Sequence, residues 1–363
     1  MPAARTNVAV VGYGYWGSKH VRVLSSLADV SVTVVDGNED RLAEAAHHYP
    51  AARLAGSLDA VVEDVDAVVV ATPPAAHTLV ALVALEAGKP TLVEKPLATS
   101  VAEAELLVET AESRGVPLMV GHTFEYNAAV RTLRDIVRSG SLGRVLYIDT
   151  ARLSLGRYQR DVNVIWDLAP HDISIVSYLL DEMPSSTSVW AQCNIGDRHA
   201  DVAYLRLQFP RSDAHAFVHV SWLNPDKVRR VTVVGERKMV VYDDMSDNER
   251  IRIYDIGVDP AEVDDPSSAH AMPVTYRSGD ITSPFIPFDE PLRVQDQHFV
   301  DCVRSGATPA TTGRRGLDIV RVLSATDRAR LDGGVVPVDD GPVAITEPAP
   351  ATVIVEQRSP VLS

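Results

Sequence analysis

The chain has 363 residues, of which 46% are hydrophobic and 23% are charged, proportions typical of a globular protein rather than a disordered or fibrous one. This length allows two domains with large cores. The formal net charge of -15 and the lack of any Lys/Arg-rich run disfavour nucleic-acid binding, because a phosphate backbone would be repelled.

Cysteine usage and hydropathy indicate the compartment. Cys193 and Cys302 match neither a disulfide framework nor a metal-ligand spacing, which favours a reducing environment. The first ten residues lack a signal-peptide pattern, and no window approaches the ~18 unbroken apolar residues of a membrane span. We therefore expect a cytoplasmic protein with no membrane partner.

The first motif is a glycine-rich turn between an apolar strand, residues 7–11, and a segment with helical apolar spacing, residues 18–27. The turn reads Gly12-Tyr13-Gly14-Tyr15-Trp16-Gly17. In this context the first glycine permits a tight turn, the second lets the backbone approach a pyrophosphate, and the third lets the helix pack on the strand. The helix N-terminus attracts phosphates. The motif predicts a dinucleotide site, although glycine turns also serve plain packing.

The second predicted strand, residues 30–35, ends at Asp36. A dinucleotide-binding unit places a carboxylate there to accept hydrogen bonds from ribose hydroxyls. Because that carboxylate would repel a 2′-phosphate, we expect NAD rather than NADP. Arg41 follows in the next helix and is expected to lie along the adenine. Capping of that helix is the other role open to Asp36.

Helix and strand signals continue to alternate, which predicts a parallel sheet covered by helices. Helices are expected at 39–48, 58–63, 76–87 and 100–114, and strands at 67–71, 91–93 and 117–120. Thr72-Pro73-Pro74 and Glu94-Lys95-Pro96 each follow a strand, at the edge where such sheets bind ligands. Lys95 is one of only five lysines, and a cis bond before Pro96 would fix the turn that carries it. A solvated loop is the alternative for Lys95.

The pattern changes after residue 124. A helix at 128–139 precedes alternating strands at 143–152, 186–193, 202–209, 214–222, 228–234, 239–243 and 250–254, which predict an antiparallel sheet in an α+β domain. Residues 259–291 predict a long surface loop, helices return at 295–306 and 316–331, and the proline-rich end predicts a frayed tail. The expected division is 1–124, 125–294, 295–340 and 341–363.

A second group of polar residues lies between the two predicted sheets. If a helix begins near Trp166 with Pro170 in its first turn, Asp167 and His171 lie one turn apart on one face. A neighbouring carboxylate orients an imidazole and stabilises its protonated form, as a general base requires. A helix cap and an ordinary helical histidine are the alternative.

Three arginines, Arg152, Arg157 and Arg160, precede that helix. Their planar forks suit a diphosphate or a carboxylate, and an exposed basic loop is the other interpretation. Farther along, His215 and His219 lie ~13 Å apart on a predicted strand, too far to share one ion. We expect no metal site.

Together, the glycine motif, Asp36, Glu94-Lys95-Pro96 and Asp167-x-x-x-His171 resemble the glucose-fructose oxidoreductase/inositol dehydrogenase/MocA family over about residues 7–340. The resemblance implies an α/β Rossmann domain with a parallel sheet, followed by an α+β domain with a large open, mostly antiparallel sheet. It also implies NAD held between the domains, C-terminal helices that pack back on the first domain, and a homotetramer or homodimer. Sugar and inositol relatives often have a glycine-rich segment directly before the catalytic aspartate. In this chain the corresponding residues, 163–166, are Asn-Val-Ile-Trp.

The resemblance and the motifs together define the expected site. The catalytic set is Lys95, Asp167 and His171. The residues expected at the cofactor are Gly12, Gly14, Tyr15, Trp16, Gly17, Asp36, Arg41, Thr72, Pro73, His77, Glu94, Lys95 and His122. The residues expected at the substrate are Lys95, Tyr126, Arg152, Arg157, Arg160, Asn163, Asp167 and His171.

Within the family, residues 166–172 and 221–230 are most similar to members that oxidise or reduce nucleotide-linked sugars at the pyranose 3-position. In that reaction His171 would remove the hydroxyl proton, Lys95 would donate a hydrogen bond to the alkoxide, and Asp167 would orient substrate and imidazole. A dehydrogenase of inositol, a free sugar or an aminoglycoside is the alternative. A non-catalytic NAD-binding regulator is the alternative of another class.

Overall fold

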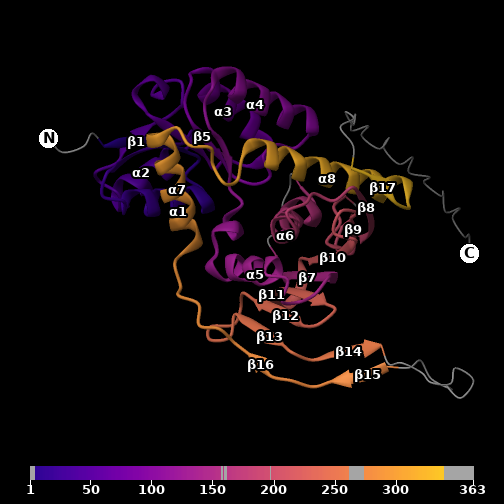
Figure 1. Ribbon diagram of the computed structural model, residues 1–363. Helices are drawn as coiled ribbons and strands as arrows, with labels where there is room; N and C mark the ends of the chain where they lie inside the picture. The colour runs from indigo at the N-terminus through magenta and orange to yellow at the C-terminus, as the bar shows by residue number, and fades with distance from the viewer. Residues whose placement is uncertain (1–4, 157, 159–161, 197, 261–273, 339–363) are drawn as a thin grey trace, which may run out of the picture.

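The first domain is built on a six-stranded parallel sheet. A computed structural model describes residues 5–338, apart from residues 157, 159–161, 197 and 261–273. Helices cover both faces of this sheet (Figure 1), so its strands are short, β-branched and buried. In spatial order the strands are β3 (Arg53–Ala55), β2 (Val30–Val35), β1 (Thr6–Val11), β4 (Ala67–Val70), β5 (Thr91–Val93) and β6 (Leu118–Val120). The helices are α1 (Tyr15–Ser25), α2 (Glu39–His48), α3 (His77–Glu86) and α4 (Val101–Arg114).

The order of the strands reverses between β1 and β4. An open parallel sheet binds ligands at such a point, outside the carboxyl ends of its strands. There β1 runs into the glycine motif, β4 into Thr72 and β5 into Lys95. Three segments far apart in the sequence therefore meet at one edge.

The second domain is a nine-stranded sheet in which β7 and β10 run parallel and the other pairs within the described residues run antiparallel. The predicted fold, a Rossmann domain followed by a mostly antiparallel sheet, is confirmed. In spatial order the strands are β16 (Ile281–Thr282), β13 (Ile251–Tyr254), β12 (Met239–Asp243), β11 (Leu223–Gly235), β7 (Val145–Leu155), β10 (Ala214–Ser221), β9 (Val202–Phe209), β8 (Ser186–Gln192) and β17 (Val336–Pro337).

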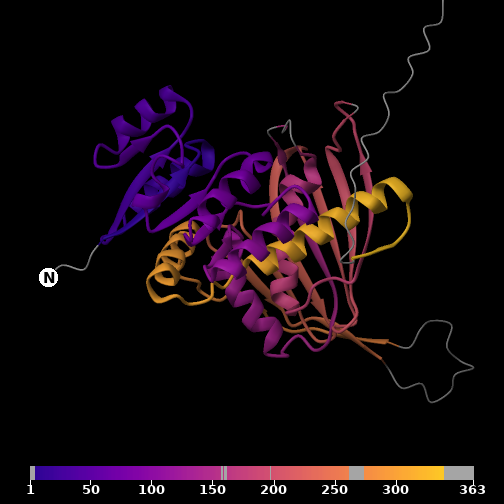
Figure 2. The ribbon, with the colours of Figure 1, turned by 90° about the horizontal axis from the view of Figure 1, so that it is seen from above.

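Helices cover one face of this second sheet (Figure 2). They are α5 (Ala128–Arg138), α6 (Val164–Leu180) and α8 (Gly313–Asp332), which contact β12, β10 and β8 respectively. Along β9 buried and exposed residues alternate, as they do when only one face is covered. The other face carries exposed aromatic side chains, among them Trp190, Tyr204 and Phe217.

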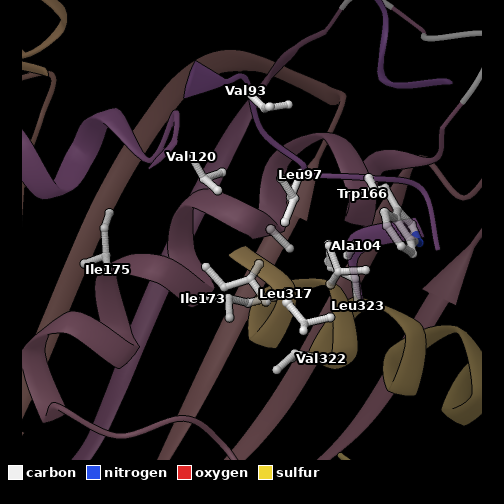
Figure 3. Close-up of a cluster of buried hydrophobic side chains, with 14 of the residues drawn as sticks. Val93, Leu97, Ala104, Val120, Trp166, Ile173, Ile175, Leu317, Val322 and Leu323 are labelled. Atoms are coloured by element: carbon white, nitrogen blue, oxygen red, sulfur yellow. The ribbon is translucent and has the colours of Figure 1, made fainter. Parts of the chain in front are cut away.

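Two C-terminal helices return toward the first domain. Helix α7 (Pro291–Ser305) packs on α1, and α8 contacts α4, α6 and β8. Figure 3 shows Leu317 and Leu323 of α8 in one apolar cluster with Val120 of the first sheet and Ile173 of α6. One core therefore continues across both domains.

The structure corrects three local predictions. Residues 58–63 do not form the expected helix, and only a 3₁₀ turn, η1 (Val62–Asp64), occurs there. Strand β3 was not predicted, because three residues at a sheet edge carry no periodic signal. Residues 259–291, expected to be loop, include β16 and part of a separate hairpin, β14 (Gly257–Pro260) with β15 (Val274–Arg277). In the described part of the chain, no helix has both the length and the apolarity to cross a membrane.

Candidate active site

The glycine motif forms a turn that only glycine can make. Gly12 has a φ of +94°, and a Cβ there would lie 2.9 Å from the Ala71 carbonyl oxygen. A Cβ on Gly17 would lie 1.7 Å from the Gly12 carbonyl oxygen. Helix α1 begins directly after Gly14, with no side chain capping it. A helix N-terminus that no cap side chain covers fits the pyrophosphate of a dinucleotide.

Asp36 is buried beside this turn. Its carboxylate accepts hydrogen bonds from the backbone N–H groups of Tyr13, at 2.7 Å, and Asn38, at 2.9 Å. Asn38, not Asp36, caps α2, so the capping alternative for Asp36 is removed. Arg41 Nη1 lies 3.4 Å from the Asp36 carboxylate. The pair lines a groove where a ribose carrying free hydroxyls fits an acceptor carboxylate.

A cleft runs from the glycine turn to Lys95. Of the residues expected at the cofactor, it is lined by Gly12, Gly14, Tyr15, Trp16, Arg41, Thr72, Pro73, His77, Glu94 and Lys95. Gly17 serves the packing of α1 against the turn. The cleft ends at Asp167 and Trp166 of α6, so its far wall comes from the second domain. This geometry fits a dinucleotide whose nicotinamide end lies between the domains.

Lys95 links the two halves of the site. Its Nζ donates to the Asp167 main-chain carbonyl at 2.7 Å and to the Asp167 carboxylate at 3.3 Å, and its side chain is only 10% exposed. The Lys95–Pro96 bond is cis, as the sequence suggested. Asp167 belongs to α6 of the second domain, whereas Lys95 follows β5 of the first. The ammonium is therefore held across the domain boundary.

The structure corrects the expected pairing of Asp167 with His171. Helix α6 begins at Val164, so Pro170 lies beyond its first turn. The Asp167 carboxylate accepts from Lys95 and, at 3.1 Å, from the Trp222 indole. Because these two donors hold it, Asp167 positions the lysine rather than the imidazole.

His171 has cations around it instead of a carboxylate. Burial lowers its pKa well below the ordinary value, and the charges of Lys95 and Arg152 lower it further. Its ring packs edge-on against Phe124, with 5.1 Å between ring centroids. Its Nδ1 has no hydrogen-bond partner among the described residues. Burial and these cations therefore favour the neutral form of the imidazole.

Behind Lys95, three ionisable side chains form a buried network. His20 of α1 contacts Glu94 at 3.1 Å and Asp296 of α7 at 2.9 Å. The side chains of His20 and Asp296 are fully buried, and that of Glu94 is 6% exposed. Burial alone would lower the pKa of His20, but attraction and hydrogen bonding from Asp296 and Glu94 raise it to about 10. Glu94 also accepts from the Lys95 backbone N–H at 3.2 Å. An imidazolium therefore fixes the segment that carries Lys95.

A second pocket, of about 380 Å³, opens on the other side of Lys95. Its volume is in the range of small-ligand sites. Lys95, Asp167 and His171 line it, and Lys95, Glu94 and Asp167 also line the cofactor cleft. All three predicted catalytic residues therefore line one pocket, and Lys95 and Asp167 lie where it meets the cofactor cleft.

Two residues predicted to bind substrate serve the framework instead. Tyr126 is only 2% exposed, and its hydroxyl lies 3.1 Å from the Thr311 hydroxyl. Asn163 caps α6, because its side-chain oxygen accepts from the N–H groups of Ile165 and Trp166. Neither residue lines the pocket.

The histidines predicted at the cofactor are also buried. The ring nitrogens of His77 lie 2.8 Å from the Pro96 carbonyl oxygen and 3.0 Å from that of Thr72, so His77 braces these two loops. His122 lies outside the cleft, with neither ring nitrogen bonded within the described structure. Burial and the neighbouring cations Arg315 and Lys95 lower the pKa of His122 to about 3.

Of the three arginines predicted to hold a diphosphate, the structure describes only Arg152. Arg152 lines the pocket, but it is 6% exposed and donates to the buried Asp172 carboxylate at 2.7 Å. The Asp172 carboxylate neutralises the guanidinium and takes hydrogen bonds from its Nε and Nη2. Arg157 and Arg160 lie outside the described residues.

Family models match both halves of this architecture. Residues 6–122 match the model described as an oxidoreductase family with an NAD-binding Rossmann fold, and residues 130–241 match the GFO/IDH/MocA C-terminal domain. The chain belongs to the Gfo/Idh/MocA oxidoreductase family.

Relatives within the Gfo/Idh/MocA family carry several names. UDP-N-acetylglucosamine 3-dehydrogenase of Acidithiobacillus ferrooxidans is 31% identical over 53% of this chain and 60% of its own length. Inositol 2-dehydrogenase of Rhodococcus erythropolis is 34% identical over 50% of this chain and 55% of its own length. These matches span little more than half of each relative. Inositol 2-dehydrogenase of Serratia proteamaculans is 27% identical over 92% of this chain and 96% of its own length.

Solved structures of this family superpose over most of the chain. A putative oxidoreductase from Magnetospirillum magnetotacticum covers 89% of this chain and 100% of its own, with a TM-score of 0.75 and 28% identity. GenD2 from gentamicin A biosynthesis, solved in complex with NAD, covers 93% and 97%, with a TM-score of 0.77 and 25% identity.

Sequence analysis missed several residues of this Gfo/Idh/MocA pocket. Phe124 and Phe288 line it, as do Arg229 of β11, Arg250 and Asp244. Arg229 lies in the stretch 221–230, whose similarity to family members assigns no role to any one residue. The alternation of β11 could have assigned Arg229 to the same face as the buried Val231 and Val233. No signal in the sequence pairs His20 with Asp296.

Proposed function

We propose that the protein is an NAD-dependent dehydrogenase or ketoreductase that interconverts a secondary alcohol and a ketone of a sugar. The proposal rests on the position of Lys95, Asp167 and His171 in one pocket, which meets the cofactor cleft at Lys95 and Asp167. Nicotinamide, when bound, supplies the hydride acceptor for oxidation or the hydride donor for reduction.

The proposed roles follow from the charges and contacts of the three residues. Neutral His171 accepts the hydroxyl proton while the carbinol hydrogen leaves as hydride, and it returns the proton in the reverse direction. The Lys95 ammonium, held by the Asp167 carbonyl, donates to the substrate oxygen as negative charge develops there. The Asp167 carboxylate keeps Lys95 in place.

NAD is preferred to NADP in this proposal. The buried Asp36 carboxylate, which Tyr13 and Asn38 fix in place, would repel a 2′-phosphate. A cytoplasmic homodimer or homotetramer is also proposed, and the exposed aromatic side chains Trp190, Tyr204 and Phe217 on the open sheet face support association.

For the substrate we propose a UDP- or dTDP-linked hexose or amino sugar, oxidised or reduced at the 3-position. The likeness to UDP-N-acetylglucosamine 3-dehydrogenase supports it. The second candidate is inositol, a free sugar or an aminoglycoside. The inositol 2-dehydrogenase that matches over 92% of the chain and the likeness to GenD2 favour this candidate.

The test is absorbance at 340 nm with NAD and a panel of UDP-sugars, dTDP-sugars, inositol and free hexoses. Turnover of a nucleotide sugar with a KM well below that of any free sugar is the expected result. Preferential turnover of inositol or of a free sugar would establish the second candidate. A protein that binds NADH and oxidises nothing in the panel would instead be a regulator.

Two variants test the assigned residues. Lys95→Ala and His171→Ala should each lower kcat by about 100-fold or more, because general acid-base groups typically contribute ~10²- to 10⁴-fold. NADH binding, measured by fluorescence, should persist. Lys89→Ala is the matched control, since Lys89 precedes β5, its Nζ donates to the Glu63 carbonyl, and it lines neither the cofactor cleft nor the substrate pocket. Near-normal turnover in both test variants would refute the assignment.

A further inference from the structure

The charged side chains that line the substrate pocket are unevenly matched. Lys95 pairs with Asp167, and Arg152 pairs with the buried Asp172. Two lining carboxylates, Glu94 and Glu290, are already paired with His20 and Arg22, cations that do not line the pocket. The Asp244 carboxylate is left to balance the remaining arginines of the pocket wall.

Two arginines share that single carboxylate. Arg229 Nη1 lies 3.2 Å from Asp244 Oδ2, and Arg250 Nη1 lies 3.5 Å from Asp244 Oδ1. Asp244 Oδ1 also accepts from the Tyr242 hydroxyl at 2.8 Å. The side chains of Arg229 and Arg250 are 37% and 22% exposed, so both guanidinium groups reach the open volume of the pocket. The Arg229–Arg250–Asp244 group therefore carries one net positive charge, and Lys19 is a further cation of the pocket lining, in a chain whose net charge is -15.

The backbone brings a further cation beside this pair. Arg229 of β11 stands directly opposite Arg152 of β7 in the antiparallel register. Asp172 neutralises Arg152, so the unmatched positive charge of this group lies on Arg229 and Arg250. Aromatic rings flank the cluster: Arg152 lies over the Phe124 ring at 4.4 Å, and Arg250 lies over the Phe288 ring at 5.3 Å. These rings limit the side-chain freedom of the arginines.

We propose that Arg229 and Arg250 form an anion subsite that binds a phosphate or carboxylate group of the substrate. The subsite rests on the proposed function, because it belongs to the same pocket and recognises the part of the substrate remote from the reacting hydroxyl. Arginine forks bind such planar or tetrahedral oxyanions with two parallel hydrogen bonds. Arg152, by contrast, is already occupied by Asp172.

The test compares Arg229→Gln and Arg250→Gln in the full chain with NADH bound. Calorimetry with UDP, inorganic pyrophosphate and glucuronate as separate probes distinguishes a phosphate subsite from a carboxylate subsite. We expect each variant to weaken binding of the preferred anion by about 10- to 100-fold, as for a charged hydrogen bond lost. With an anionic substrate KM should rise by that factor while kcat changes little, and KM for a neutral sugar should not change.

Arg230→Gln is the matched control, because Arg230 is the next residue on β11, points to the other face and pairs with Asp243. It should leave anion binding unchanged. The subsite is refuted if the unmodified protein binds none of the three probes, or if Arg229→Gln and Arg250→Gln bind them normally. Anion binding that both variants lose, in a protein that oxidises no sugar, would keep the subsite and reject the proposed function.

Discussion

At the scale of single residues, the environment of His171 determines how activity should depend on pH. Burial, Lys95 and Arg152 all lower its pKa, and Asp167 forms hydrogen bonds to Lys95 and Trp222 instead. The sequence predicted a raised pKa for His171, because the one-turn spacing from Asp167 suggests a carboxylate beside the imidazole. Spacing alone could not show that Trp222, 55 residues away, donates to that carboxylate.

The neutral form of His171 is the base, so activity should fall only when pH drops below its lowered pKa. The expected result is a kcat/KM profile for oxidation whose acidic limb has an apparent pKa under 6.5. Initial rates from pH 4.5 to 9 with saturating NAD would measure it. An acidic limb above 6.5 would mean that a carboxylate controls His171 after all. Arg230→Gln, remote from the imidazole, should give the same profile as the unmodified protein.

At the scale of elements, His20 joins α1, the end of β5 and α7 through two carboxylates. Because its folded pKa, about 10, is above the ordinary 6.5, its contribution to stability is complete below pH 6.5. That contribution declines as pH rises toward 10. A buried imidazolium therefore stabilises the docking of α7 most at mildly acidic pH, below 6.5 but above the pKa of the Asp296 carboxyl, which burial raises.

His20→Gln should lower the free energy of unfolding by about 3–5 kcal/mol at pH 6.5, because it leaves two buried carboxylates without their cation. The deficit relative to the unmodified protein should shrink as pH approaches 10. Urea unfolding at several pH values measures it, with the exposed His48→Gln as the control. A deficit that does not change between pH 6.5 and 10 would show that His20 is not charged in the folded state.

Much of this element arrangement could be predicted from the sequence. Strands β2, β5, β9 and β12 lie where their β-branched and alternating patterns indicated, because local sequence determines such periods. The glycine turn and Lys95 could be placed at one edge because parallel strands end together. Strand β17 could not, since Val336 and Pro337 form a strand only through pairing with β8.

At the scale of the whole molecule, α8 is the element that joins the two domains. It contacts α4 of the first domain and α6 and β8 of the second. A Cβ on Gly316 would lie 2.5 Å from the Val120 Cγ2 and 3.3 Å from the Leu97 Cβ. The close approach of α8 to the first sheet therefore requires glycine at that position.

Gly316→Val should lower the free energy of unfolding by about 1–3 kcal/mol or more, because overpacking a stiff core shifts its neighbours. Gly196→Val is the control, since a Cβ there meets no atom within 4 Å. Thermal unfolding of both variants gives the comparison. Equal melting temperatures would mean that α8 can move away from Val120 at no cost.

The substrate side of the site was less predictable than the cofactor side, for a topological reason. Cofactor residues follow their strands directly, so local motifs locate them. Arg229 and Arg250 come from β11 and from the loop before β13, and they meet only because the sheet pairs β11 with β12 and β12 with β13. Local patterns determine no such register between strands.

The shortest bond of Lys95 goes to the Asp167 backbone carbonyl, not to its side chain. Every residue type has that carbonyl, so mutation at position 167 cannot delete it. A substitution at position 167 would therefore remove the carboxylate beside the ammonium, while the hydrogen bond from Lys95 to the backbone could persist. At position 167 the main-chain carbonyl holds the Lys95 ammonium, and the side chain determines the charge beside it.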